Sequence, residues 1–154
     1  MTHEIHNLIS IDEIKHFLRI TSNIDDNLLK DLLETAVFHL EDYLSKGIIN
    51  QIYEQVLIRS KEVLKYGPIS QIYNVQTASG QDISYHLQDN IIEVSYQLEP
   101  VIVRYKGGLF SKQIPPEIKI AILNIVSSLY NSEPGKVSID TILNQFRTIR
   151  NLKL

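Results

Sequence analysis

The chain has 154 residues, of which 44% are hydrophobic and 21% charged, and its net charge is -3 at pH 7. These values are ordinary for a globular protein and predict one domain spanning residues 1–154. The absence of cysteine excludes disulfides, cysteine zinc sites and thiol nucleophiles. The first ten residues have no basic segment followed by an apolar one, so we expect an intracellular site of synthesis.

Charge is spread unevenly along the chain. Residues 1–47 hold four Lys/Arg against nine Asp/Glu, residues 48–100 hold three against six, and residues 101–154 hold eight against three. Nucleic-acid binders usually carry one dominant basic face, which this pattern does not predict. An acidic N-terminal part and a basic C-terminal part are compatible with copies that associate head to tail. The alternative is that these charges are solvated surface with no partner.

The first half of the chain predicts two helices, at 10–19 and 26–46. Ser10 and Glu13 form the pattern of a capping box, and Ile9 and Ile14 stand at the positions of a hydrophobic staple. The second helix has a broad stripe of leucines, and Gly47 is placed to end it in the left-handed conformation.

Residues 50–106 change to a β pattern, with alternating and β-branched segments separated by turn signals such as Gly67-Pro68 and Ser79-Gly80. We expect a small antiparallel sheet here, inserted between the second and third helices. With two more helices after it, the predicted fold class is α+β, with a mainly helical core of about four helices.

A helix at 116–131 is expected to lie at the centre of the fold. Pro116 suits its first turn, and apolar residues cover most of its circumference, so it must be surrounded. It is too short and too interrupted by polar residues to span a bilayer. The expected core residues are Ile118, Ala121, Ile122, Ile125, Val126 and Leu129.

The last predicted helix covers 138–151, with Ser138 as its cap and an apolar stripe that includes Ile142 and Phe146. The chain stays apolar and basic to its end, where free termini usually fray and are polar. Two interpretations remain open: the segment packs on its own domain, or it docks on another subunit.

The sequence holds little that predicts chemistry. Nucleotide-binding, nucleophile-elbow and zinc-protease motifs are absent. His3 and His6 lie near Asp12, but a metal site would need a third ligand on a rigid element. An enzyme built from dispersed residues such as His86, Arg104 and Asp82 would need a pocket and perturbed titration. We therefore expect no catalytic residue, cofactor or metal, and we expect the tyrosines to pack in the sheet.

The order of these segments resembles the phage head-tail connector family, also called head completion or adaptor proteins and often described as DNA-packaging proteins. The resemblance covers nearly the whole chain, although each motif is short. Asn131-Ser132-Glu133, at the end of the 116–131 helix, and Phe146 depart from the family pattern. The segments that carry it are Ile9 to Ile20, Leu40 to Leu44, Gly67 to Ile72, Val103 to Gly108, Ile114 to Lys119, Ala121 to Leu123, Leu129 to Asn131 and Leu143 to Arg147.

The resemblance implies a structural virion protein without enzymatic activity. Such a protein forms a ring of about a dozen copies under the portal, extends the DNA channel and prepares the packaged head for tail attachment. Its partners would be other copies, the portal, the next head-completion or tail protein, and DNA passing without sequence-specific contact. The alternative is a stand-alone regulatory module that binds one partner through its C-terminal helix. The implied portal-docking residues are Ile142, Phe146, Arg147, Ile149, Arg150, Leu152 and Lys153.

The same resemblance implies localisation at the head-tail interface of a virion made in a bacterial cytoplasm, with no membrane contact. It also implies that deleting Leu143 to Leu154 leaves a folded protein that no longer binds the portal.

Overall fold

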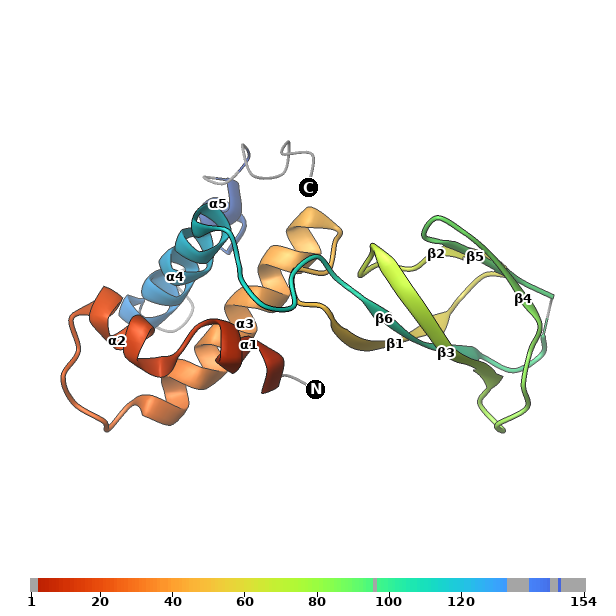
Figure 1. The fold of residues 1–154 in the computed structure, drawn as a ribbon, viewed down its shortest axis with the longest axis horizontal. Helices are drawn as coiled ribbons and strands as arrows, with labels where there is room; N and C mark the ends of the chain where they lie inside the picture. The colour runs from red at the N-terminus through yellow and green to blue at the C-terminus, as the bar shows by residue number, and fades with distance from the viewer. Residues whose placement is uncertain (1–2, 96, 133–138, 145–146, 148–154) are drawn as a thin grey trace. The chain divides into compact units, whose positions relative to one another are not determined.

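A computed structural model describes residues 3–95, 97–132, 139–144 and 147 (Figure 1). Contacts between residues divide the chain into two compact units. Of the described residues, the helical unit contains those from 3 to 44 and from 112 onward, and the sheet unit contains those from 45 to 111. The prediction of a single domain over residues 1–154 stays a prediction.

The chain begins with two short helices in the helical unit, α1 (His3–Leu8) and α2 (Ile11–Leu18). The capping box predicted before α2 is present, because the Ser10 hydroxyl accepts from the Glu13 N–H at 3.2 Å and the Glu13 carboxylate accepts from the Ser10 N–H at 2.9 Å. Ile9 and Ile14 are both buried. Helix α1 was not predicted, because six residues are too few to show a helical period.

Helix α3 (Asp26–Leu44) ends two residues before the predicted boundary. The expectation that Gly47 ends it in the left-handed conformation is wrong, because Ser45 takes that conformation with φ 52°. Gly47 is needed for a different reason. A Cβ there would lie 2.9 Å from the Gly108 Cα and 3.0 Å from the Tyr66 carbonyl oxygen, so the close approach of these segments excludes a side chain.

Helix α4 (Pro116–Asn131) packs against α3, and α5 (Ile139–Asn144) contacts both. Five of the six expected core residues of α4 are buried: Ile118, Ala121, Ile122, Ile125 and Val126. Leu129 is half-buried. The described part of the predicted 138–151 helix is α5 and residue 147, and the other residues of that range lie outside the described ones.

The sheet unit contains two antiparallel three-stranded sheets. The first has the order β1 (Gln51–Leu57), β6 (Val101–Gly107), β3 (Ile69–Thr77), and the second has β2 (Lys61–Val63), β5 (Ile91–Val94), β4 (Tyr85–Gln88). Alternation along β6 sends Val101, Val103 and Tyr105 to one face, which is buried.

The inner faces of the two sheets share one hydrophobic core. Tyr53 and Tyr105 from the first sheet lie in it with Leu64 and Ile92 from the segments around the second. The Tyr53 and Tyr66 rings stack with centroids 4.3 Å apart, and the Tyr53 hydroxyl donates to the Ile49 carbonyl at 2.9 Å. These tyrosines therefore pack in the sheet, as predicted.

Backbone hydrogen bonds join the two ends of the sheet unit. The Leu109 N–H donates to the Gly47 carbonyl at 3.0 Å, and the Phe110 N–H donates to the Ile48 carbonyl at 2.9 Å. Gly108, which follows β6, has φ 107°, a conformation that favours glycine. The chain thus leaves the sheet unit beside the point where it enters.

The α+β class is confirmed, but two details differ from the prediction. The described residues form five helices rather than about four, because α1 was missed. The β segment forms two sheets rather than one; it follows the helix predicted at 26–46, which is α3 once α1 is counted.

Candidate interaction surfaces

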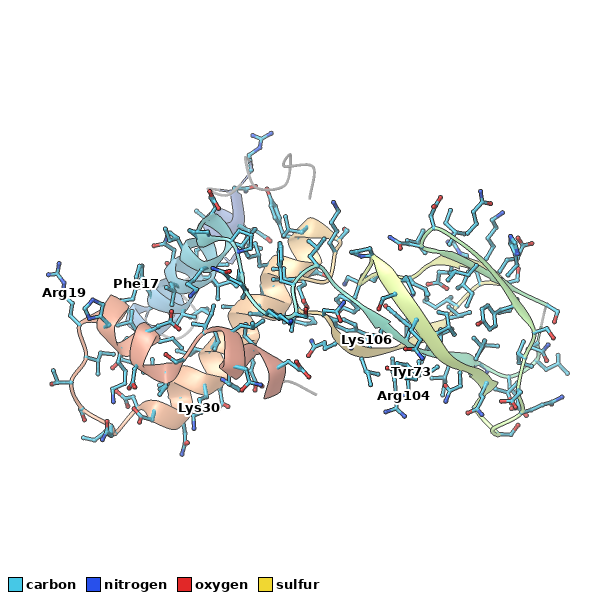
Figure 2. All side chains as sticks on the ribbon, in the orientation of Figure 1. Phe17, Arg19, Lys30, Tyr73, Arg104 and Lys106 are labelled. Carbon is cyan, nitrogen blue, oxygen red and sulfur yellow. The ribbon has the colours of Figure 1, made fainter. Side chains whose placement is uncertain are left out.

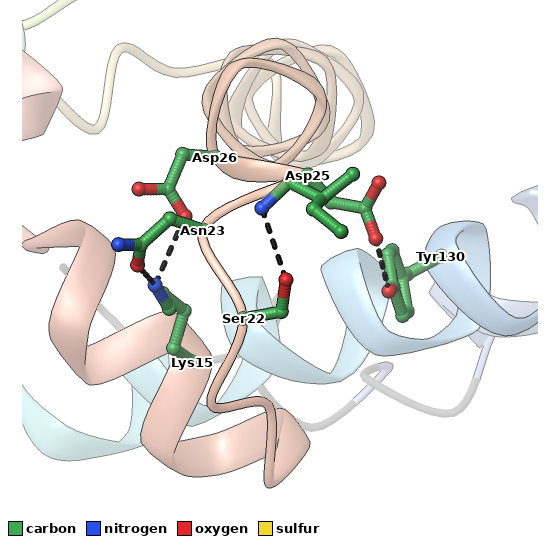
Figure 3. Close-up of polar contacts among 7 residues, drawn as sticks. Lys15, Ser22, Asn23, Asp25, Asp26 and Tyr130 are labelled. Carbon is green, nitrogen blue, oxygen red and sulfur yellow. Dashed lines mark hydrogen bonds and ion pairs between the residues drawn. The ribbon is translucent and has the colours of Figure 1, made fainter.

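A polar cluster joins the α2–α3 loop to α3 (Figure 3). The Lys15 side chain is 9% exposed, and its ammonium lies 3.0 Å from an Asp26 carboxylate oxygen. The same ammonium donates to the Asn23 side-chain oxygen. Since Asp26 is the first residue of α3, its charge is also favoured by the positive end of the helix dipole. The cluster fixes the loop with a buried cation that has two oxygen partners.

A second polar contact links the α2–α3 loop to α4 beside this cluster (Figure 3). The Tyr130 hydroxyl donates to an Asp25 carboxylate oxygen at 2.7 Å. This hydrogen bond raises the pKa of Tyr130 above its usual value near 10, because ionising the phenol would remove the donor and place two negative charges together.

A groove runs along α2 and α4, with a volume of about 410 Å³. We call it the α2–α4 groove; it is lined by Ser10, Asp12, Glu13, His16, Phe17 and Leu123. The Phe17 side chain is 39% exposed (Figure 2), although large aromatic residues are usually buried. Ile120 precedes Leu123 by one turn and is 52% exposed. The groove is therefore apolar inside and acidic along α2.

One carboxylate in the groove lining, Glu13, forms an ion pair with α4. The Lys119 ammonium lies 2.8 Å from a Glu13 carboxylate oxygen. That hydrogen bond, together with the Ser10 N–H, lowers the pKa of Glu13, because both donors favour the ionised carboxylate. Glu13 is thus paired with Lys119 of the same chain, whereas Asp12 is exposed.

The sheet unit carries two highly exposed apolar side chains that line one cleft. Ile58, after β1, is 86% exposed, and Leu98, before β6, is 93% exposed. Both line a cleft of about 450 Å³ between the segment around β1 and the segment that leads into β6. Exposed apolar residues that gather in this way mark interaction sites more often than single scattered ones do.

The outer face of the β1–β6–β3 sheet has mixed character. Arg104 and Lys106 alternate with the buried residues of β6 and so share this face (Figure 2). The Arg104 Nε lies 3.9 Å from a Glu54 carboxylate oxygen on β1, and Tyr73 on β3 is 45% exposed. This face has no excess of charge that would define a partner.

The predicted docking residues lie near the end of the chain, where few residues are described. Arg147 is exposed. Ile142 is 7% exposed, so its side chain belongs to the core of the helical unit in this structure. Leu143, where the predicted deletion starts, is also buried. The remaining docking residues, Phe146, Ile149, Arg150, Leu152 and Lys153, lie outside the described residues.

The residues considered for chemistry belong to separate contacts. His6 lies 3.0 Å from Glu34, Arg104 lies near Glu54, and Asp82 accepts a hydrogen bond from Gln76 at 2.8 Å. Within the described ranges, no group of three or more histidines and carboxylates is arranged to hold a metal ion.

Sequence reasoning missed the two exposed apolar sites. Phe17 falls near the end of a short predicted helix, and Ile58 falls within the predicted β segment 50–106, so both fit ordinary core patterns. A signal was available for Ile58, because Arg59-Ser60-Lys61-Glu62 is a polar run typical of a turn.

Comparison with known proteins places the chain in a family. The family model described as "Phage gp6-like head-tail connector protein" matches residues 8–111, which is more than half of the chain. The chain therefore belongs to the phage gp6-like head-tail connector family, and the resemblance drawn from its sequence is confirmed. The family is one of structural phage proteins.

Solved structures with the same fold come from gene transfer agent (GTA) particles. The neck of an empty GTA particle, computed with C6 symmetry, matches with a TM-score of 0.67 at 14% identity over 100% of this chain and 95% of that one. The neck of the native particle, computed with C12 symmetry, gives 0.63 at 15% identity over 100% and 96%. The native GTA virion gives 0.60 at 17% identity over 94% and 92%.

The search of curated proteins found no significant match. Among the described helices, none has both the length and the apolar character needed to cross a bilayer.

Proposed function

We propose that this chain is a structural protein of the head-tail interface of a virion. Copies of it form a ring below the portal, extend the DNA channel and prepare the packaged head for tail attachment. The observation that carries this proposal is the family match over residues 8–111. The likeness to chains in particle necks computed with C6 and C12 symmetry supports it, since rotational symmetry is what a ring of identical copies has.

The portal contact is proposed for the C-terminal segment after Asn144. Its sequence alternates apolar residues with three cations and has no carboxylate side chain. A partner with an acidic, partly apolar groove would fit this chemistry. The exposed side chain of Arg147 supports the assignment. The residues proposed for the contact are Phe146, Arg147, Ile149, Arg150, Leu152 and Lys153.

The test is co-sedimentation of the full chain with portal rings encoded by the same genome. We expect the full chain to bind the ring and a chain lacking residues 145–154 to lose binding while keeping its circular dichroism spectrum. The deletion starts after Leu143 because removing that buried residue would damage the helical unit. The matched control reverses charge elsewhere, with Lys30→Glu at an exposed position of α3, and should bind as well as the unmodified chain.

Two results would contradict the proposal. Unchanged portal binding by the truncated chain would remove the C-terminal segment from the contact. Binding of a single copy per portal assembly, measured by light scattering, would support a regulatory module instead of a ring former.

A further inference from the structure

Both units of the chain expose apolar side chains, and one site in each unit combines them with charge. In the helical unit it is the α2–α4 groove, with Phe17 and Leu123 in its lining. In the sheet unit it is the turn that follows β1, where Ile58 projects with 86% of its surface exposed. We call residues 58–60 the β1–β2 turn. The groove is a hollow, and Ile58 on the turn is 86% exposed beside the cleft that it lines with Leu98.

The β1–β2 turn is held in one conformation by its own chain. The Glu62 carboxylate accepts from the Ile58 N–H at 2.8 Å and from the Arg59 N–H at 3.2 Å. These bonds occupy the Glu62 carboxylate, and Lys61 is paired with Glu93 at 3.5 Å. Glu99, which lines the same cleft as Arg59, accepts from the Ser79 N–H at 3.1 Å. Arg59 is thus the exposed cation that the turn presents. A projecting side chain on a turn that is already ordered loses little conformational entropy when it binds.

The α2–α4 groove has the complementary character. Its lining is apolar at Phe17 and Leu123, and its rim carries Asp12. Glu117 is exposed on α4, one turn before Ile120. Lys119 on α4 is already paired with Glu13 at 2.8 Å, and His16 also lines the groove. An incoming group that is apolar at its tip and cationic beside it therefore meets matching chemistry.

We propose that the α2–α4 groove of one copy receives the β1–β2 turn of a second copy, with Ile58 against Phe17 and Arg59 beside Asp12. This inference rests on the proposed function, because it names the contact that joins neighbouring copies in the ring. Two different sites that fit each other make a head-to-tail contact, which is the kind that forms rings. A contact between two identical grooves would bring Asp12 against Asp12.

Cysteine cross-linking tests the contact directly, because the chain has no native cysteine. Full-length Ile58→Cys protein is mixed with full-length Phe17→Cys protein of different mass, and a short thiol linker is added. The control mixture replaces Phe17→Cys by Ile24→Cys, which lies in the same unit and is more accessible, since Ile24 is 90% exposed.

We expect Ile58→Cys to cross-link to Phe17→Cys about tenfold faster than to Ile24→Cys, because docking raises the effective concentration of the two thiols. Equal rates for the two mixtures would overturn the proposal. So would faster cross-linking between two copies of the Phe17→Cys protein. The cross-link needs only transient contact, so it reads out the docking mode whether or not the free protein is a stable ring.

Charge exchange gives an independent readout. Arg59→Glu should weaken association of copies about tenfold, and mixing this variant with Asp12→Lys protein should restore it. If rings form on the portal while neither the cross-link nor the rescue occurs, this contact is wrong and the proposed function stands. If the unmodified chain neither binds the portal nor associates, the proposed function itself fails.

Discussion

At Gly108 two segments of the chain approach so closely that the position requires glycine. Its φ of 107° suits glycine, and a Cβ at this position would overlap the carbonyl oxygen of Ile49. Because Ile49 and Phe110 form a bridge between the two segments that bound the sheet unit, neither segment can move away without breaking the hydrogen bonds that join them. The requirement for glycine is therefore both conformational and steric.

We predict that Gly108→Ala lowers the free energy of unfolding by about 3 kcal/mol, through strain and overlap with Ile49. Gly80→Ala is the matched control, because Gly80 also has positive φ but open space around its Cα. It should cost only about 1 kcal/mol, the conformational penalty alone. Urea denaturation measures both, and equal losses would mean that steric overlap at Gly108 is unimportant.

Tyr130 gives a prediction in alkaline solution. Its hydrogen bond to Asp25 raises its pKa in the folded protein, so the stabilisation is complete below pH 10 and is lost as pH rises through the raised pKa. Tyr130→Phe should therefore be less stable than the unmodified chain at neutral pH, and the gap should close at alkaline pH. Denaturation midpoints across pH measure this, with Tyr73→Phe, at an exposed position, as the control.

At the scale of elements, the start of α3 depends on a buried charge. Lys15 is almost completely buried, and Asp26 and Asn23 are its partners. A buried ammonium whose carboxylate is removed keeps its desolvation cost and loses its compensation. The contact lies between one helix and the start of the next, so it fixes the loop that joins them.

We predict that Asp26→Ala lowers the free energy of unfolding by about 2 kcal/mol. The matched control is Glu93→Ala, which breaks an ion pair with Lys61 that is exposed on both sides. Its cost should be about 0.5 kcal/mol or less, because exposed ion pairs are screened by solvent. Comparable losses in the two variants, measured by thermal denaturation, would argue against a special role for Lys15.

Local signals predicted some elements well and others poorly. The capping box before α2 and the apolar circumference of α4 led to helices in the right places, because both signals lie within the element itself. Strand β2 has only three residues, Lys61–Val63, and pairs with β5 about thirty residues later. A pairing of that kind leaves no periodic pattern, so the second sheet could not be predicted.

The long edge strand β3 illustrates another feature that sequence patterns do not reveal. Its pairing with β6 shifts register between Ile69 and Gln71 and again between Ile72 and Asn74. Such irregularities bend a strand and make its free edge a poor template for pairing with another chain. For this reason we place the proposed contact between copies at a turn and a groove instead of at a sheet edge.

At the scale of the whole molecule, the sheet unit has the properties of an independent folding unit. Its two sheets enclose their own core, and hydrogen bonds at Gly47 and Ile48 join its two ends. We predict that a fragment of residues 45–111 folds alone and gives a dispersed amide NMR spectrum with slow exchange at Val103 and Tyr105. A collapsed spectrum would show that the sheet unit needs the helical residues to fold.

The candidate sites were less predictable than the fold. The family resemblance directed attention to the C-terminal segment, whereas the structure draws attention to Phe17 and Ile58. The residues adjacent to Phe17 and Ile58 in the sequence form patterns compatible with burial. Both side chains are exposed because of how residues distant in sequence pack. The acidic N-terminal part of the chain was visible in its composition, but its association with an apolar groove required the contact between α2 and α4.

The adjacency of Gly47 and Leu109 has a practical consequence for engineering. A segment whose two ends meet can be exchanged for a longer or shorter one without stretching the chain that holds it. A chimaera that carries residues 48–108 of another connector would therefore show whether this segment determines the architecture of the phage neck.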